Sequence, residues 1–217
     1  MPGVAFFDLD RTILDCNSAT LWVKRQLREG RMRRMDAIKM GLMIGMYQMG
    51  RGNIDVAVKQ AIRGLKGDRE DEIRQRTEIF WAEEIAQRIR PGVMPVIEAH
   101  RAAGDALVLL TGSSTYLSQC ALEALRMDHI LCTLFDVVDG TFTGEGTLCY
   151  GPGKRVAAQA YLDDSGVGWE DCSFYTDSYT DISVLDVVAH PVAVHPDPRL
   201  LRRARKSGWP VADWGKA

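Results

Sequence analysis

The sequence predicts an α/β fold in which a parallel sheet lies between two layers of helices. From residue 91 onward, short apolar segments alternate with helical segments of about ten or more residues, the length that a crossover between parallel strands requires. Such crossovers place helices on both faces of one sheet. The alternation is broken once, because the first apolar segment, at 2–14, is followed by residues 18–88, which show only helical periodicity. We therefore expect an α/β core that carries an inserted helical subdomain.

The first predicted strand, residues 2–14, leads into the helical insertion. The periodicity and the intervening glycines predict helices at 18–29, 33–49, 54–64 and 69–88. Asn53 and Asp68 are the predicted N-caps of the last two of these helices. Ligands of open α/β sheets bind at the carboxyl ends of the strands. Because the insertion directly follows the first strand, it is predicted to lie over that end as a lid.

The remainder of the chain supplies the other elements of the predicted core. Helices are expected at 93–102, 115–126, 153–162 and 181–188, and strands at 106–110, 172–176 and 191–195, with a short apolar stretch at 130–134. A β-hairpin is predicted over 134–150, with turns at Asp139-Gly140 and Gly144-Glu145-Gly146. The predicted division is a core of residues 1–14 and 89–217 with a helical cap of residues 15–88.

Composition limits the function classes. The chain of 217 residues is 46% hydrophobic and 26% charged with a formal net charge of -2, which is typical of a globular protein and argues against nucleic acid as a partner. The five cysteines show no CxxC spacing, so we expect reduced thiols. The apolar stretch 38–49 is too short to span a membrane, and no basic region precedes the first apolar segment. A cytoplasmic location is expected, and the oligomeric state is not predicted.

Polar residues follow the predicted strands at the edge where parallel strands end. Four segments carry them: Asp8-Leu9-Asp10-Arg11-Thr12, Thr111-Gly112-Ser113-Ser114, Gly151-Pro152-Gly153-Lys154 and Asp177-Ser178-Tyr179-Thr180-Asp181. Acids at the end of a buried strand need compensation, most simply by a divalent cation. Carboxylates around Mg²⁺, with a lysine and hydroxyls, suit phosphoryl transfer.

In order and spacing these segments resemble the four motifs of the haloacid dehalogenase superfamily of phosphohydrolases, in particular its phosphoserine-phosphatase-like branch. The resemblance covers about residues 4–14 and 91–197 and implies a three-layer, Rossmann-like core with a helical cap. It implies Asp8 as nucleophile, Asp10 as general acid and base, and Thr111 and Lys154 as further catalytic residues. It also implies phosphate or substrate contacts from Thr12, Gly112 and Ser113, and a magnesium site of Asp8, Asp10, Asp177 and Asp181. Arg11, which lies inside the first motif, is expected either to contact substrate at the entrance or to be simply exposed. The backbone carbonyl of Asp10 is the group of that residue expected to bind the metal.

The chain departs from the family pattern at three positions. Thr176 and Thr180 replace the usual glycine and asparagine of the fourth motif, which leaves both acids in place. Asn17 stands where phosphoserine phosphatases carry a substrate-binding glutamate. The expected partner for a substrate ammonium group is therefore missing, and phosphoserine is not the expected substrate.

The predicted function is a magnesium-dependent phosphomonoesterase that acts on a small phosphorylated metabolite through an aspartyl-phosphate. One alternative is a phosphotransferase of the same fold, and another is a phosphoaccepting switch similar to a response-regulator receiver.

Two features of the insertion each have two possible roles. Its basic residues, Lys24, Arg25, Arg28, Arg31, Arg33 and Arg34, form either a solvated face or a site for a second anionic group of the substrate. Met40, Met43, Met46 and Met49 serve either core packing or an apolar substrate wall.

Overall fold

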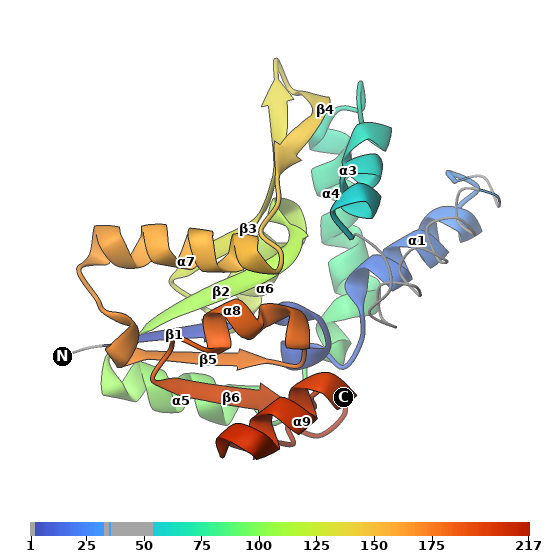
Figure 1. Cartoon of the computed structure of the whole chain (residues 1–217). Coiled ribbons are helices and arrows are strands. Elements are labelled where there is room, and N and C mark those ends of the chain that lie inside the picture. Colours follow the sequence, from blue (N-terminus) through green and yellow to red (C-terminus); the bar gives the residue numbers. More distant parts are fainter. Residues whose placement is uncertain (1–2, 33–34, 36–53) are drawn as a thin grey trace.

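A seven-stranded sheet in the order β4-β3-β2-β1-β5-β6-β7 forms the centre of the molecule (Figure 1). The computed structural model describes residues 3–32, 35 and 54–217. The strands are β1 (Val4–Phe7), β2 (Ala106–Ser114), β3 (His129–Val138), β4 (Thr141–Thr147), β5 (Cys172–Thr176), β6 (His190–Val194) and β7 (Val211–Ala212). All neighbouring strands pair in parallel except β3 and β4, which form an antiparallel hairpin. The predicted α/β class is confirmed.

Helices cover both faces of this sheet. The α-helices are α1 (Ser18–Arg28), α3 (Ile54–Gly64), α4 (Glu70–Phe80), α5 (Val93–Ala103), α6 (Thr115–Leu125), α7 (Pro152–Ser165), α8 (Ile182–Leu185) and α9 (Pro198–Ser207). Shorter helical turns are η1 (Leu9–Ile13), η2 (Trp81–Ile85), η3 (Ala86–Arg88), η4 (Trp169–Asp171) and η5 (Tyr179–Asp181). No described helix has the length and apolar character needed to cross a membrane.

The central strand β1 shows why the core has three layers. Successive side chains of a strand point to opposite faces, and here both faces are apolar. Ala5 and Phe7 pack into one buried cluster with α5 and α6, whereas Val4 and Phe6 pack into a second with α7, α8 and α9. Because β1 is buried on both sides, Asp8, the residue that follows Phe7, is buried at the carboxyl end of the strand.

The helical insertion leaves and rejoins the core at one place. Leu14 and Ile89 form an antiparallel bridge, and the N–H groups of Asp15 and Arg90 donate to the carbonyls of Arg88 and Ile13, each at 2.9 Å. These contacts join the two crossings in a short ladder, which we call the hinge ladder. It supports the proposed division into a core of residues 1–14 and 89–217 and a cap of residues 15–88.

The β3–β4 hairpin provides a second attachment of the cap. Figure 1 shows the hairpin projecting from the sheet beside α3 and α4. The N–H of Gly67 donates to the carbonyl of Phe142 and the N–H of Phe142 to the carbonyl of Asp68, both at 3.0 Å. Phe142 also packs in a buried cluster with Ile73 of α4 and Tyr116 of α6. Backbone pairing and apolar packing therefore fasten this half of the cap to the core.

Several predicted boundaries are wrong for identifiable reasons. The strand predicted at 2–14 ends at Phe7, because the backbone turns at Asp10 and Arg11, where φ of Arg11 is 61°. The helix predicted at 69–88 is α4 followed by the wider turn η2 and the tighter turn η3. Asp68 is not its N-cap, since Arg69 occupies that position and the backbone of Asp68 pairs with Phe142.

Other differences lie in the second half of the chain. β2 extends to Ser114, because its last residues continue to pair with β3. The helix predicted at 181–188 is split into η5 and α8. The hairpin turns at Asp139-Gly140, whereas the second predicted turn, around Gly144, lies inside β4. The five cysteines are free, as expected. The predicted helix 33–49, the cap at Asn53 and the four methionines lie outside the described residues.

The attachment of the cap through the hairpin yields a stability prediction. Phe142 is 2% exposed, so Phe142→Ala is expected to lower the free energy of unfolding by about 3 kcal/mol through lost burial and a residual cavity. Val138 of the same hairpin is 60% exposed, and Val138→Ala is expected to cost under about 1 kcal/mol. Urea unfolding of both variants measures the difference. Equal losses would contradict a buried junction at Phe142.

Candidate active site

Asp8 lies at the carboxyl end of the central strand. Its N–H donates to the carbonyl of Tyr175 in β5 at 2.9 Å, which continues the sheet pairing by one residue. The side chain is buried, with 6% of the residue exposed. Its Oδ1 accepts from Lys154 Nζ at 2.6 Å, and its Oδ2 accepts from Thr12 Oγ1 at 3.2 Å. Both carboxylate oxygens are thus oriented by neighbouring side chains.

Lys154 connects two strand ends through one buried ammonium group. It lies in the first turn of α7, and its Nζ donates to Asp8 and, at 2.7 Å, to Asp181 Oδ2. Burial alone lowers the pKa of a lysine, but the carboxylates of Asp181 and Asp8 outweigh this effect and raise the pKa of Lys154 above its usual value. The side chain therefore remains charged and bridges the two acids.

The fourth segment supplies Asp177 and Asp181. Asp181 Oδ2 also accepts from Thr176 Oγ1 at 2.7 Å, while Oδ1 is buried without a hydrogen-bond partner in the described part of the chain. The N–H of Asp177 donates to Thr12 Oγ1 at 3.0 Å, which ties this segment to the first one. Burial, followed by the charges of Asp8 and Asp181, raises the pKa of Asp177 well above its ordinary value.

This arrangement leaves negative charge that one lysine does not balance. Asp8, Asp177 and Asp181 are all buried around the single ammonium of Lys154. Burial, opposed by Lys154, raises the pKa of Asp8 to about 6. The orphaned Oδ1 of Asp181 and these raised pKa values fit a site that receives a cation. The described residues contain no group of three or more His, Cys, Asp or Glu side chains placed to hold a metal by themselves. A bound ion would take its remaining ligands from backbone, water and phosphate oxygens, as Mg²⁺ commonly does.

Asp10 is held by the first helix of the cap. Its Oδ1 accepts from the N–H of Ser18 at 2.8 Å, and its Oδ2 accepts from Ser18 Oγ at 3.0 Å. Burial raises the pKa of Asp10, and the bonds from Ser18 oppose that increase. Since both carboxylate oxygens already bond to Ser18, the backbone carbonyl is the group of Asp10 left for a cation.

Thr111, Gly112 and Ser113 lie at the end of β2. Thr111 is 1% exposed, and its Oγ1 accepts from the N–H of Ser113 at 3.2 Å. Thr133 Oγ1 donates to the carbonyl of Gly112 at 2.9 Å and so fixes the loop from β3. A Cβ at Gly112 would lie 3.3 Å from the ring of Tyr150, which favours glycine there. This end of β2 therefore combines the buried Thr111 with the half-buried Gly112 and Ser113, and hydroxyl and N–H groups of this kind suit an anion.

Arg11 occupies an unusual position in the first segment. Its φ of 61° is in the left-handed region, and its N–H donates to the carbonyl of Cys16 at 2.9 Å. The side chain is exposed, and its charge partly opposes the burial that raises the pKa of Asp10 and of Asp177. Arg11 is therefore near the acids but at the outer side of the site.

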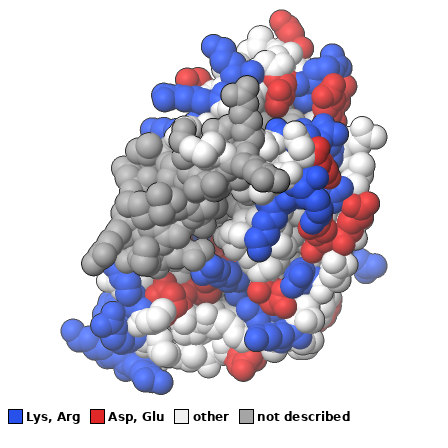
Figure 2. Space-filling view, turned by 90° about the vertical axis from the view of Figure 1, so that its right-hand side faces the viewer, with Lys and Arg blue, Asp and Glu red and all other residues white. Residues whose placement is uncertain are grey.

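Ion pairs involve three of the basic residues on and directly after the first cap helix. Arg25 pairs with Glu29, Glu83 and Glu84, Arg28 pairs with Glu84, and Arg31 pairs with Glu29. Figure 2 shows positive and negative side chains intermingled on the face that contains the cap. The paired residues favour the solvated-face interpretation, whereas Arg33 and Arg34 lie outside the described residues.

The structure adds positioning residues that the sequence analysis missed. Asn17 is the N-cap of α1, because its Oδ1 accepts from the N–H of Thr20 at 2.9 Å and from its hydroxyl at 2.7 Å. An Asn directly before a helix was the available indication. Asp197 Oδ2 accepts from the N–H of Tyr179 at 2.8 Å and holds the fourth segment, a contact between distant segments that no local pattern indicates.

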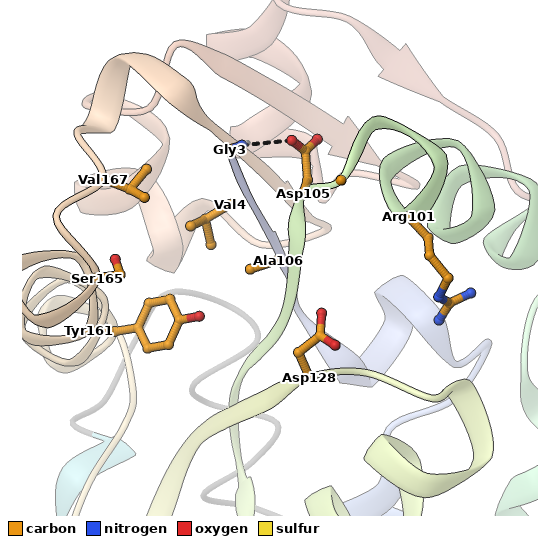
Figure 3. Close-up of a pocket in the computed structure, with 10 residues that line it drawn as sticks. Gly3, Val4, Arg101, Asp105, Ala106, Asp128, Tyr161, Ser165 and Val167 are labelled. Atoms are coloured by element: carbon orange, nitrogen blue, oxygen red, sulfur yellow. Dashed lines mark hydrogen bonds between the residues drawn. The ribbon is translucent and has the colours of Figure 1, made fainter. Parts of the chain in front are cut away.

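A separate cavity of about 430 Å³ opens at the amino ends of β1 and β2 (Figure 3). Asp105 and Asp128, which line it, already bond within the protein. Asp105 accepts from the N–H of Gly3 at 2.7 Å and contacts His100, and Asp128 accepts from the N–H of Leu107 at 2.8 Å. Because the catalytic candidates lie at the opposite ends of the strands, this cavity is not the candidate active site.

Comparison with known proteins gives one consistent result. A family model described as haloacid dehalogenase-like hydrolase matches residues 5–186. The phosphoserine phosphatase SerB1 of Mycobacterium tuberculosis is 29% identical over 99% of this chain and 71% of its own length. The histidinol-phosphatase of Neisseria meningitidis is 27% identical over 99% of this chain and 100% of its own. A crystal structure of a protein of unknown function from Bordetella pertussis is 28% identical, covers 99% of this chain and 100% of its own, and has a TM-score of 0.89.

Burial of Asp8 yields a pH-dependent stability prediction. Its pKa rises from 3.8 to about 6 in the folded protein, so the folded state binds the proton more tightly and the stability contributed by Asp8 falls as pH increases through this interval. Asn at this position is uncharged at every pH. With a chelator present, Asp8→Asn and the wild type are expected to have similar melting temperatures at about pH 4 and the variant the higher one at about pH 8. A less stable variant at the higher pH would mean that the attraction of Lys154 outweighs burial.

Proposed function

The chain belongs to the haloacid dehalogenase-like hydrolase family, and we propose that it is a magnesium-dependent phosphomonoesterase that forms an aspartyl-phosphate on Asp8. Its membership of this family and its relatives identify it as a phosphatase that cleaves phosphoric monoesters. The observation that carries the finer proposal is the buried Lys154, which holds Asp8 and Asp181 together at the sheet edge. A carboxylate oriented in this way is suited to attack phosphorus.

The proposed reaction has two steps with balanced proton transfers. A carboxylate oxygen of Asp8 attacks the phosphorus, the bond from phosphorus to the leaving oxygen breaks, and Asp10 donates its proton to that oxygen. Water then attacks the phosphorus of the aspartyl-phosphate, the bond to Asp8 breaks, and Asp10 accepts the proton of the water. Burial raises the pKa of Asp10, and a pKa raised toward the working pH is the direction that favours a general acid.

The other residues bind and orient the phosphoryl group. Lys154 supplies a fixed positive charge, and Thr111 with the N–H groups of Gly112 and Ser113 supplies donors. Thr12 orients the nucleophile through its bond to Asp8. Arg11 is proposed to contact substrate at the entrance. Fixed charges and donors of this kind stabilise the charge that develops in phosphoryl transfer.

Magnesium is proposed to be held by the carboxylates of Asp8 and Asp177 and the backbone carbonyl of Asp10. Asp181 would add a further ligand through its Oδ1, which has no hydrogen-bond partner in the described part of the chain. When bound, the ion supplies charge neutralisation for the phosphoryl oxygens. The substrate is proposed to be a small phosphorylated metabolite. Asn17 carries an amide whose oxygen caps α1, so this position offers no carboxylate for an amino group of the substrate.

The nucleophile is tested by steady-state phosphate release. A panel of phosphomonoesters is assayed with and without Mg²⁺, and Asp8→Asn is expected to lower turnover by about 10³-fold or more on every substrate. Asp163→Asn, an exposed change on α7, is the control and is expected to retain activity. Full activity of Asp8→Asn would exclude the mechanism. Product analysis with competing alcohols distinguishes transfer of the phosphoryl group to an alcohol from hydrolysis. A long-lived phosphorylated chain without multiple turnover would indicate the receiver-like switch.

Metal binding is tested by thermal unfolding, independently of activity. Because Asp177 is proposed to bind Mg²⁺, the ion is expected to raise the melting temperature of the wild type but not that of Asp177→Asn. In chelator, Asp177→Asn is expected to be no less stable than the wild type, since a crowded buried charge is removed. Asp186→Asn, which changes a surface acid paired with Arg203, is the control. An undiminished response of Asp177→Asn to Mg²⁺ would exclude Asp177 as a ligand.

A further inference from the structure

Arg90 is a buried arginine at the junction of cap and core. It belongs to the hinge ladder, where its N–H donates to the carbonyl of Ile13 at 2.9 Å, and the residue is only 6% exposed. Burying a guanidinium group is costly unless its donors are used. No carboxylate pairs with it within the described residues, and its Nε is buried without a partner there. The role of this buried side chain is therefore to be found in the groups to which its other two nitrogens donate.

Those donors reach two carbonyls from distant parts of the chain. Nη2 donates to the carbonyl of Arg11 at 3.3 Å, and Nη1 donates to the carbonyl of Gly215. Arg11 lies between Asp10 and Thr12, so its carbonyl belongs to the loop that carries the proposed acid. One side chain thus connects the hinge, this loop and the C-terminal segment.

The C-terminal segment is itself fixed, which makes it a firm support for Arg90. The N–H of Gly92 donates to the carbonyl of Trp214 at 2.9 Å, and the N–H of Trp214 donates to His195 Nε2 at 2.8 Å. The ring of Trp214 packs against Tyr175, whose carbonyl accepts from Asp8. A Cβ at Gly92 would lie 2.7 Å from the Cα of Trp214, so any larger residue at this position would displace the C-terminal segment.

The loop needs such a restraint because its backbone is strained. A left-handed φ in a residue other than glycine is unfavourable and persists only when surrounding contacts enforce it. At Arg11 these contacts are its N–H bond to Cys16 and the bond from Arg90 to its carbonyl. The bond from Arg90 acts on the backbone next to Asp10, whereas Ser18 holds the Asp10 carboxylate from the cap, so the two contacts restrain the same residue from opposite sides of the junction.

We propose that Arg90 is a positioning residue that holds Asp10 in place as the general acid by fixing the carbonyl of Arg11 against the hinge and the C-terminal segment. The proposal rests on the function proposed above. It predicts a defect in protonation of the leaving oxygen rather than a general loss of activity. Leaving groups that depart without a proton are therefore expected to be nearly insensitive to Arg90.

The test compares two aryl phosphates, phenyl phosphate and 2,4-dinitrophenyl phosphate, of which only the first needs a proton on its leaving oxygen, and each variant is compared with the wild type on the same ester. Arg90→Gln is expected to lower kcat/KM for phenyl phosphate by about 100-fold, the effect of a small misplacement of a catalytic group, and by less than about tenfold for the dinitrophenyl ester. Arg90→Lys retains the charge but cannot reach both carbonyls, so the same bias is expected in weaker form.

Three further variants make the comparison decisive. Asp10→Asn is the reference for a missing acid and is expected to show the same bias between the esters. Arg88→Gln is the matched control, because Arg88 lies two residues away on the hinge with its side chain 45% exposed, and both esters are expected to be hydrolysed at the wild-type rate. Gly92→Ala displaces Trp214 without changing Arg90 and is expected to reproduce the bias, and it replaces Arg90→Gln if that variant does not fold.

The outcomes separate the two proposals. Equal losses on both esters in Arg90→Gln, with the bias present in Asp10→Asn, would overturn the positioning role and leave the phosphatase mechanism intact. Equal losses in Asp10→Asn would overturn the acid role of Asp10, and the proposal for Arg90 with it. A bias in Arg90→Gln and Asp10→Asn that is absent in Arg88→Gln is the expected result.

Discussion

The buried ammonium of Lys154, bonded to Asp8 and Asp181, is the interaction on which the rest of the site depends. Removing several carboxylates from water at one sheet edge is unfavourable, and one lysine compensates only part of their charge. The uncompensated negative charge is reflected in the raised pKa of Asp8 and in Oδ1 of Asp181, which has no hydrogen-bond partner among the described residues. A cation and a phosphate group would complete this balance. The folded protein thus keeps a site whose electrostatics favour the ligands that it is proposed to bind.

The proposed cap contributes to the site through direct hydrogen bonds. Ser18, in the first turn of α1, binds both carboxylate oxygens of Asp10, so a movement of that helix changes the environment of the proposed acid. The other half of the cap is held at Phe142 of the hairpin. The proposed closure of the cap would have to proceed around two fixed junctions, the hinge ladder and the hairpin. This arrangement links substrate enclosure with positioning of the acid.

The departures from the family pattern have structural explanations. Thr176, which replaces a glycine, bonds to Asp181 and orients it toward Lys154. Thr180 bonds to Ser178 within the same turn, so it stabilises the loop that carries both acids. Asn17 caps α1. These positions support the phosphotransfer machinery, while the groups that would select an amino acid substrate are absent from them.

The sequence by itself determined the α/β class, the four segments at the strand ends and the placement of a helical insertion after β1. These features follow from local periodicity and from the rule that parallel strands end at one edge. Tertiary structure decided that the first strand stops at Phe7 and that Arg11 adopts a left-handed backbone. The partners that constrain Arg11 are the carbonyl of Cys16, which no sequence motif marks, and the side chain of Arg90, which is far away in sequence. It also decided the bonds of Ser18 to Asp10 and of Asp197 to Tyr179. Such contacts depend on the packing of separate elements, whose three-dimensional arrangement no local pattern encodes.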